Sequence, residues 1–171
     1  VTPHPLEIEV NRAYGCYIYD INDKKYLDFI AGVSACSLGH CHPKVIEAIK
    51  KQLDKYLHVM VYGEFILQPA VNLTRLLSKH LPKGLDSTYL TNSGTEAIEG
   101  AIKLARKYTG RKEIIGANNA YHGSTLGALT LMGKIENRKP FEPLLPEVSF
   151  INFNNLNDIN KICLLYTSPS P

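Results

Sequence analysis

The residues best suited to chemistry stand where a short apolar segment gives way to an amphipathic pattern. Residues 90–97 read Leu-Thr-Asn-Ser-Gly-Thr-Glu-Ala. Ser93 and Glu96 have the spacing of a capping box, so we expect a helix to begin there. The first N–H groups of a helix lack internal partners and lie at the positive end of its dipole. Gly94 and Thr95 therefore predict an anion site, for which a phosphate is the natural ligand.

This turn differs from the common nucleotide-binding loops. It has neither the G-x-G-x-x-G pattern nor the lysine of a Walker loop, which disfavours a dinucleotide or the phosphate chain of ATP. A capped turn between a strand and a helix also occurs in α/β proteins that bind nothing there. The turn alone therefore leaves a purely structural role open.

A second cluster follows the next expected strand, at residues 112–117. Residues 121–125 read Tyr-His-Gly-Ser-Thr and precede a short apolar segment that we expect to be helical. Loops that follow the strands of an α/β sheet are common ligand-binding positions. The ring of Tyr121 could stack on a planar ligand, although an aromatic residue in a loop more often packs against the protein itself.

The triplet His40-Cys41-His42 contains metal-ligating side chains, but we do not interpret it as a zinc site. Three consecutive residues cannot all face one tetrahedral ion without strain, and the sequence has no second ligand cluster. We therefore assign no metal ligands.

The elements that must position these clusters follow from hydrophobic spacing. Helical periodicity predicts four helices: one from Ser93 to Thr109-Gly110, one that Pro43 opens, one over about residues 69–81, and a short one after residue 125. Runs of β-branched, aromatic and apolar residues predict five strands: residues 15–21, 25–30, 87–91, 112–117 and 146–151.

Composition sets limits on the class of protein. With 171 residues, 44% hydrophobic and 20% charged, the chain fits an ordinary globular domain with a buried core. Its net charge of +3 is too small and dispersed to argue for nucleic acid or a membrane, and no apolar run approaches the ~20 residues of a membrane span. The four cysteines lack the spacing of a disulfide framework, which indicates free thiols in a reducing cytoplasm.

Taken together, these blocks resemble class III pyridoxal-phosphate-dependent aminotransferases, with the ornithine and acetylornithine enzymes as the nearest branch. Four blocks occur in the family's order and spacing: residues 25–29, 39–43, 92–106 and 121–125. The resemblance implies an α/β fold, the fold-type I transferase fold, in incomplete form. Residues 1–60 would be a small-domain segment, and residues 61–162 the start of the large domain with its mostly parallel sheet.

The resemblance also implies that the cofactor is pyridoxal 5'-phosphate. In the family, the backbone N–H groups of the pair matching Gly94 and Thr95 hold the cofactor phosphate, and we include the neighbouring Ser93 in this site. The aromatic residue matching Tyr121 stacks on the pyridine ring, and His122 follows it at the cofactor edge. A helix N-terminus suits a dianion and a flat aromatic ring suits a π-system, so these roles agree with the residue types.

No residue of this chain is assigned a catalytic role. Family members carry the Schiff-base lysine and the acid that keeps the pyridine nitrogen protonated well downstream of the position matching Phe150. Lys134, Lys139 and Lys161 match neither position. We therefore expect an N-terminal fragment that is inactive and folds poorly by itself. Residues 163–171 fit nothing in the family, and we expect them to be a foreign or divergent tail.

Two positions depart from the family pattern in a way that bears on the substrate. Ser124 stands where many members, including ornithine, acetylornithine and 4-aminobutyrate enzymes, have an Arg that binds a substrate carboxylate. Val33 stands where ornithine enzymes have a Tyr. We therefore expect an ω-amino acid or diamine-type donor with a 2-oxo acid acceptor.

Family members are homodimers, so we expect a cytoplasmic homodimer with no nucleic-acid or membrane partner. Two alternatives stay open: another fold-type I enzyme, such as a decarboxylase or racemase, and a non-catalytic phosphate-binding module complete at 171 residues. A complete module predicts a closed sheet and a satisfied core. The transaminase interpretation predicts that residues 112–117 pair with 146–151 and leave an unpaired strand at 88–91.

Overall fold

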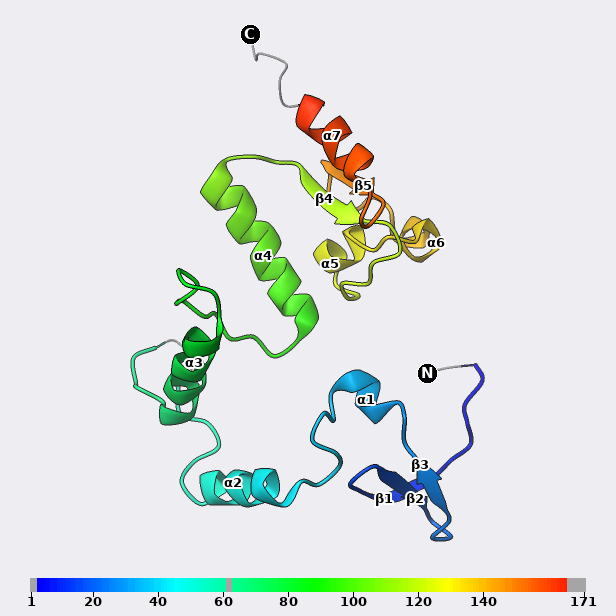
Figure 1. Ribbon diagram of the computed structural model, residues 1–171, viewed down its shortest axis with the longest axis vertical. Coiled ribbons are helices and arrows are strands. Elements are labelled where there is room, and N and C mark those ends of the chain that lie inside the picture. The colour runs from blue at the N-terminus through cyan, green and yellow to red at the C-terminus, as the bar shows by residue number, and fades with distance from the viewer. Residues whose placement is uncertain (1–2, 61–62, 166–171) are drawn as a thin grey trace. The chain divides into compact units, whose positions relative to one another are not determined.

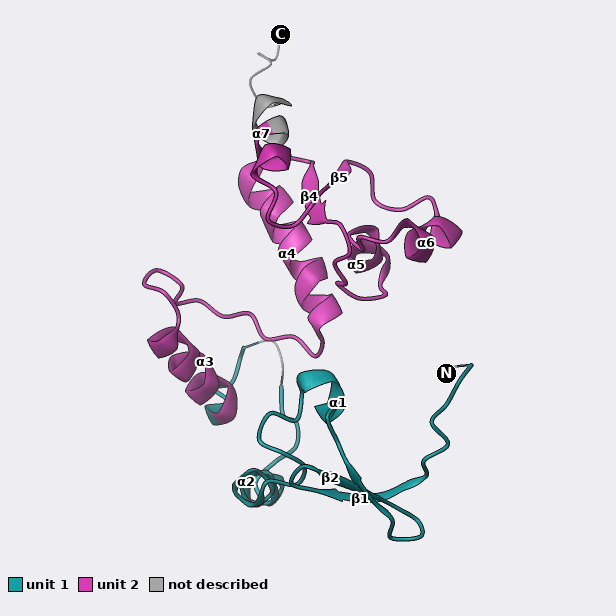
Figure 2. Cartoon of the chain, turned by 45° about the vertical axis from the view of Figure 1, so that its right-hand side comes forward, with its two compact units in different colours: residues 1–68 teal, residues 69–171 magenta. Residues whose placement is uncertain are grey.

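The computed structural model describes residues 3–60 and 63–165 (Figure 1). The chain divides into two compact units, residues 1–68 and residues 69–171 (Figure 2). The domain boundaries predicted at residues 60 and 162 stay a prediction. Of the predicted tail, residues 166–171 lie outside the described residues.

Unit 1 is built on a three-stranded antiparallel sheet in the order β1-β2-β3. The strands are β1 (Val10–Tyr14), β2 (Tyr17–Asp20) and β3 (Lys25–Leu27). The predicted strand pair is confirmed as β2 and β3, with Ile18 opposite Tyr26. Strand β1 was not predicted, because its sequence Val-Asn-Arg-Ala-Tyr has no clear alternation and its pairing with β2 contains an irregularity.

The turn between β2 and β3 is held by the carboxylate of Asp20. Its Oδ1 accepts hydrogen bonds from the backbone N–H groups of Asn22 at 2.8 Å and Lys24 at 3.0 Å, and its Oδ2 accepts one from the Tyr26 hydroxyl at 2.9 Å. Asp23 adopts the left-handed region with φ +59°. An Asp tolerates this conformation better than most residues, so the turn forms without glycine.

The family-like block at residues 39–43 has a structural function in unit 1. The Nε2 of His40 lies 2.7 Å from Oδ2 of Asp28, whose other oxygen accepts the N–H groups of Ile30 and Ala31. The backbone of His40 also exchanges two hydrogen bonds with Gly15, at 3.0 and 2.7 Å. His40 therefore ties the turn before the next helix to the strands.

The Asp28–His40 contact predicts a dependence of stability on pH. The hydrogen bond from His40, with a smaller one from the N–H of Ala31, lowers the pKa of Asp28 against the opposing effect of burial. A depressed folded-state pKa stabilises the protein above the unfolded value, near 4, and this contribution is lost as the pH falls through the folded value. In the full-length protein, we expect Asp28→Asn to lower the melting temperature by a few degrees at pH 7.

The same substitution should flatten the fall in melting temperature between pH 5 and pH 3, measured by circular dichroism. The control is Asp23→Asn, which removes only an exposed contact with Arg12. An unchanged slope in the Asp28 variant would show that this carboxyl does not contribute to acid stability.

Helix α2 (Pro43–Leu53) belongs to unit 1 and begins at the predicted proline. Helix α3 (Gln68–His80) lies in unit 2 apart from its first residue and matches the helix predicted over residues 69–81. The apolar pattern of α2 continues to residue 57, but the helix ends at Leu53. The short element α1 (Ala31–Ser34) has non-helical dihedral angles at its centre.

Unit 2 contains the candidate site. Its helix α4 (Gly94–Thr109) leads into strand β4 (Ile114–Ala117), which pairs in parallel with β5 (Val148–Ile151) from Ile114 opposite Val148 to Ala117 opposite Ile151. This parallel pairing confirms the predicted partner of residues 112–117. The remaining elements are α5 (Leu126–Thr130), α6 (Ile135–Arg138), the 3₁₀ turn η1 (Lys139–Phe141) and α7 (Leu156–Leu165).

The prediction of a strand at residues 87–91 is wrong. In the described part of the chain this segment joins no sheet, and Tyr89 is exposed. Its β-branched and aromatic residues favour an extended backbone, but a strand needs a hydrogen-bonded neighbour, which propensity does not supply. The segment does stay apart from β4, as the transaminase interpretation predicts.

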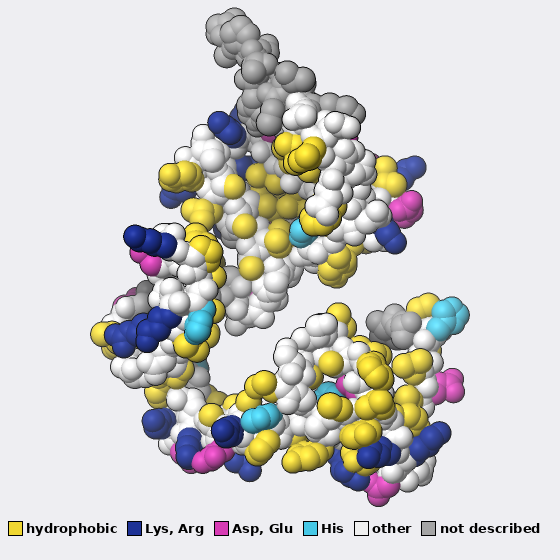
Figure 3. Space-filling view, viewed as in Figure 1, with side chains coloured by type: hydrophobic (Ala, Val, Ile, Leu, Met, Phe, Trp, Pro, Cys, Tyr) yellow, Lys and Arg dark blue, Asp and Glu magenta, His cyan; other side chains and the backbone are white. Residues whose placement is uncertain are grey.

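The core of unit 2 lies at the contact between α4 and α5. The buried apolar residues are Ile102, Ala128, Leu129, Leu131 and Met132. Other large apolar side chains remain on the surface of unit 2, among them Leu104 at 67% and Tyr108 at 87% exposure, and hydrophobic atoms gather on the visible face of this unit (Figure 3). The described residues thus lack the satisfied core that a complete binding module predicts. Among them, no helix is both long and apolar enough to cross a lipid bilayer.

Candidate functional site at the first turn of helix α4

Helix α4 begins and ends where the sequence predicts. Ser93 is the extended N-cap residue, and its Oγ accepts a hydrogen bond from the N–H of Glu96 at 3.2 Å. The carboxylate of Glu96 turns back and accepts the N–H of Asn92 at 2.7 Å. The helix ends at Gly110, which adopts the left-handed conformation with φ +69°.

The first turn of α4 presents two backbone donors to open space. Gly94 and Thr95 are the first two helical residues, and no acceptor for their N–H groups occurs among the described residues. A Cβ placed on Gly94 would have no atom within 4 Å. The positive end of the helix dipole and two free donors therefore face an accessible surface, which is the arrangement that an anion requires.

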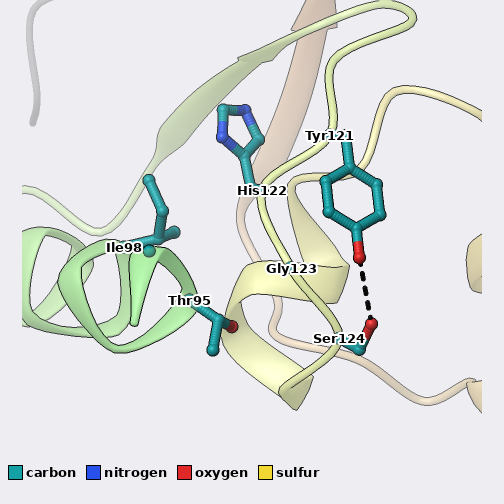
Figure 4. A pocket seen from close by; sticks show the side chains of 7 residues that line it. Thr95, Ile98, Tyr121, His122, Gly123 and Ser124 are labelled. Carbon is teal, nitrogen blue, oxygen red and sulfur yellow. Dashed lines mark hydrogen bonds between the residues drawn. The ribbon is translucent and has the colours of Figure 1, made fainter. Parts of the chain in front are cut away.

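A pocket of about 610 Å³ lies in front of this turn (Figure 4). Its lining residues come from α4 and from the loop after β4: Gly94, Thr95, Ile98, Tyr121, His122, Gly123 and Ser124. The structure therefore brings together the two predicted anion-binding residues, the predicted aromatic and imidazole residues, and the predicted substrate residue Ser124. Ser93 does not line the pocket and acts as the helix cap.

Tyr121 and Ser124 form one wall of the pocket. The Tyr121 side chain is 71% exposed, and its hydroxyl lies 3.4 Å from Oγ of Ser124, as the dashed line in Figure 4 shows. The ring is not buried against the protein, so its face is available for stacking on a planar ligand. Ser124 carries no charge and offers one short hydroxyl group to whatever lies beside the ring.

The loop that carries Tyr121 passes very close to the first turn of α4. Gly123 has φ +127°, and a Cβ at this position would overlap the Cβ and Oγ1 of Thr95. Only glycine combines this backbone conformation with so close an approach. Gly123 belongs to the 121–125 motif, but its role is not predictable from the sequence, because a contact between residues 95 and 123 has no local signal.

Glu99 connects the helix to the same loop, and the sequence interpretation missed it. Its Oε1 accepts hydrogen bonds from the Thr125 hydroxyl at 2.6 Å and from the N–H groups of Gly127 and Ala128 at 2.9 and 3.3 Å. The Thr125 hydroxyl, with smaller contributions from those N–H groups, lowers the pKa of Glu99 although burial opposes this. One signal was available: Glu99 follows Thr95 by four residues and so shares its helix face.

Val33, the other predicted substrate residue, belongs to unit 1. It lies within α1 with φ +56°, and its side chain is 87% exposed. Its role in substrate binding stays a prediction.

Comparison with known proteins identifies strong similarities over most of the chain. The sequence pattern of the family described as Aminotransferase class-III matches residues 1–165. The chain is 42% identical over 144 residues to acetylornithine aminotransferase of Archaeoglobus fulgidus, covering 84% of this chain and 37% of the relative. It is 42% identical over 139 residues to acetylornithine aminotransferase of Methanopyrus kandleri, covering 80% of this chain and 35% of the relative.

Solved structures give the same result for the fold. Ornithine aminotransferase of Toxoplasma gondii aligns with a TM-score of 0.82 at 29% identity, covering 95% of this chain and 39% of that chain. Adenosylmethionine-8-amino-7-oxononanoate aminotransferase of Methanocaldococcus jannaschii aligns with a TM-score of 0.86 at 30% identity, covering 96% of this chain and 42% of that chain. The chain thus has the fold-type I architecture and spans less than half the length of the proteins it matches.

Proposed function

This chain belongs to the class-III aminotransferase family, and on that basis we propose that the whole protein is a pyridoxal-phosphate-dependent transaminase. It would move an amino group from an ω-amino acid or diamine-type donor to a 2-oxo acid. One observation carries the proposal: the free N–H groups of Gly94 and Thr95 share a pocket with the exposed ring of Tyr121.

The residues of the pocket fit the family cofactor, pyridoxal 5'-phosphate. Gly94 and Thr95 would hold its dianionic phosphate through their backbone N–H groups, aided by the helix dipole. Tyr121 would cover one face of the pyridine ring, and His122 would lie at its edge. When bound, the cofactor supplies the electron sink for bond changes at the amino-bearing carbon of the substrate.

The nearby carboxylates are hydrogen-bonded to groups that do not line the pocket. Glu96 accepts the N–H of Asn92, and Oε1 of Glu99 accepts from Thr125 and the start of α5. Neither Glu96 nor Glu99 lines the pocket itself. This arrangement supports the phosphate assignment for Gly94 and Thr95.

The activity is proposed for the whole protein. The pocket lining includes no lysine, and Lys134 and Lys139 flank α6 instead. The residues described here bind and orient the cofactor, and none of them is proposed as a proton carrier. We further propose a cytoplasmic homodimer, as in the family, and the exposed apolar side chains Phe29 and Ile30 of the early segment are consistent with a subunit interface.

Donor choice provides the test of this function. The full-length enzyme should transfer amino groups from ω-amino acids or diamines to a 2-oxo acid. The reaction is measured as consumption of the 2-oxo acid in the presence of added pyridoxal phosphate. We expect Ser124→Arg to raise kcat/KM for donors with a carboxylate at least tenfold relative to diamines, because a guanidinium binds a carboxylate through charge-assisted hydrogen bonds. One such bond is worth roughly 1.5–3 kcal/mol, and about 1.4 kcal/mol already corresponds to tenfold.

Ser124→Ala is the matched control, since it removes the hydroxyl without adding a charge, and it should leave the ratio between donor classes within about twofold. An unchanged donor ratio in the Arg variant would remove Ser124 from the substrate site. Absence of transfer from every amino donor in the wild-type enzyme would refute the transaminase assignment itself.

A further inference from the structure

We infer that Glu99 is a positioning residue for the cofactor site, because its carboxylate fastens the end of the loop that carries Tyr121 to α4. It thereby sets the spacing between the phosphate donors and the stacking ring. The inference rests on the proposed function, and it concerns a side chain that does not line the pocket in front of Gly94.

The hydrogen bonds of the Glu99 carboxylate all come from one short segment, residues 125–128. Its Oε1 accepts three donors, the hydroxyl of Thr125 and the N–H groups of Gly127 and Ala128, which are 26 to 29 residues away in the chain. Those two N–H groups belong to the first turn of α5, where the helix itself offers them no acceptor. Thr125 is the N-cap residue of α5, but its side chain accepts no hydrogen bond from the N–H groups of the helix. The carboxylate of Glu99 therefore acts as the cap of α5.

The directions of these hydrogen bonds also determine the orientation of Thr95. Because Thr125 donates its only hydroxyl proton to Glu99, its oxygen must accept in the 2.8 Å contact with Oγ1 of Thr95. The hydroxyl of Thr95 is thereby committed to Thr125. Its backbone N–H remains the donor available to a phosphate in the pocket.

Tyr121 has little else to hold it in place. Its ring is mostly exposed, and its one side-chain hydrogen bond in the described part of the chain is the long contact with Ser124. Helix α5, in contrast, is buried through Ala128 and Leu129. The loop runs from β4 past the first turn of α4 into α5 (Figure 4). The bonds to Glu99 thus hold the end of this loop against α4, and Glu99 itself does not line the pocket.

The experiment compares cofactor affinity with stability in the full-length apoenzyme. Glu99→Ala should raise the dissociation constant for pyridoxal 5'-phosphate at least tenfold, measured by absorbance titration. Glu99→Gln should stay within about threefold of wild type, because its amide oxygen can accept the two shorter hydrogen bonds, from Thr125 and Gly127. The control is Glu113→Ala, which removes a 2.8 Å hydrogen bond from the hydroxyl of Ser149 in β5 to the residue before β4 and should leave the dissociation constant within twofold.

The outcomes separate positioning from simple destabilisation. The inference is supported if Glu99→Ala loses cofactor affinity tenfold, Glu99→Gln restores it, and neither variant melts at a lower temperature than Glu113→Ala. Equal dissociation constants for Glu99→Ala and Glu113→Ala overturn it. If Glu99→Ala does not fold, Thr125→Val decides: a threefold or greater loss of affinity supports the inference, and wild-type affinity overturns it. A wild-type apoenzyme that binds no pyridoxal phosphate would overturn the proposed function and this inference with it.

Discussion

Replacement of Gly123 by alanine in the full-length enzyme is expected to reduce cofactor affinity at least a hundredfold. A Cβ at this position would overlap the side chain of Thr95 and lie 3.1 Å from its Cα. Carbon atoms in proteins pack at about 3.5–4.0 Å, so the loop must move by roughly 1 Å or α4 must shift. The φ of +127° adds backbone strain of about 1–3 kcal/mol for any residue with a side chain. Either displacement separates Tyr121 from the N–H groups of Gly94 and Thr95.

The matched control for Gly123→Ala is Gly100→Ala, also at a glycine of unit 2. Gly100 lies in the middle of α4, and a Cβ there would lie 3.7 Å from the ring of Tyr89, an ordinary contact. Alanine in a helix is more stable than glycine by about 0.5–1 kcal/mol, so this variant should retain affinity and melt at the same or a higher temperature. Cofactor affinity of Gly123→Ala within threefold of wild type would contradict the close packing of the loop against Thr95.

The second large effect is expected from a charge placed where the phosphate would bind. Gly94→Asp should weaken binding of pyridoxal phosphate at least a thousandfold without destabilising the apoenzyme. The space around Gly94 accommodates a side chain, and a carboxylate in the first turn of a helix gains about 0.3–1 kcal/mol from the dipole. Against a phosphate roughly 4 Å away the same carboxylate costs about 4 kcal/mol for each unit of charge at an effective dielectric constant of 20.

Gly94→Asn isolates the contribution of charge, because its side chain has nearly the same shape and is neutral. We expect its dissociation constant to lie within about tenfold of wild type, and the ratio between the Asp and Asn variants to shrink as salt is raised. Affinity is measured by absorbance titration of the apoenzyme and stability by its melting temperature. Equal affinities for the two variants would place the phosphate somewhere other than the first turn of α4.

Local sequence signals were sufficient to predict structure where the interacting groups are close in the sequence. The cap between Ser93 and Glu96 spans three residues, and the stop at Gly110 depends on one left-handed residue, so both ends of α4 could be predicted. The turn between β2 and β3 is likewise closed within five residues by Asp20. In each case the determining hydrogen bond joins groups that the chain already holds near one another, so little conformational entropy is lost in forming it.

Strands were harder to predict from the sequence, because a strand is defined by the neighbouring strand with which it pairs. Strand β1 was missed although it pairs with β2, and a strand was predicted at residues 87–91 where none forms in the described structure. The residue types at 87–91 favour an extended backbone. An extended segment becomes a strand only when a neighbouring strand pairs with it, and residue types alone do not specify that neighbour. The pairing of β4 with β5 was predicted correctly because the family resemblance, unlike propensity, carries information about topology.

The sequence by itself determined the family, through four short blocks in a fixed order. It also determined the capped turn that offers two N–H groups to an anion and the loop motif that supplies an aromatic ring, since each of these is formed by consecutive residues. Only the tertiary structure decided how the turn and the loop meet. The overlap that excludes a side chain at Gly123 and the hydrogen bond from Thr125 to Glu99 join residues that lie 28 and 26 positions apart. Such contacts depend on how α4 packs against α5, and packing is a property of the folded chain rather than of any short segment.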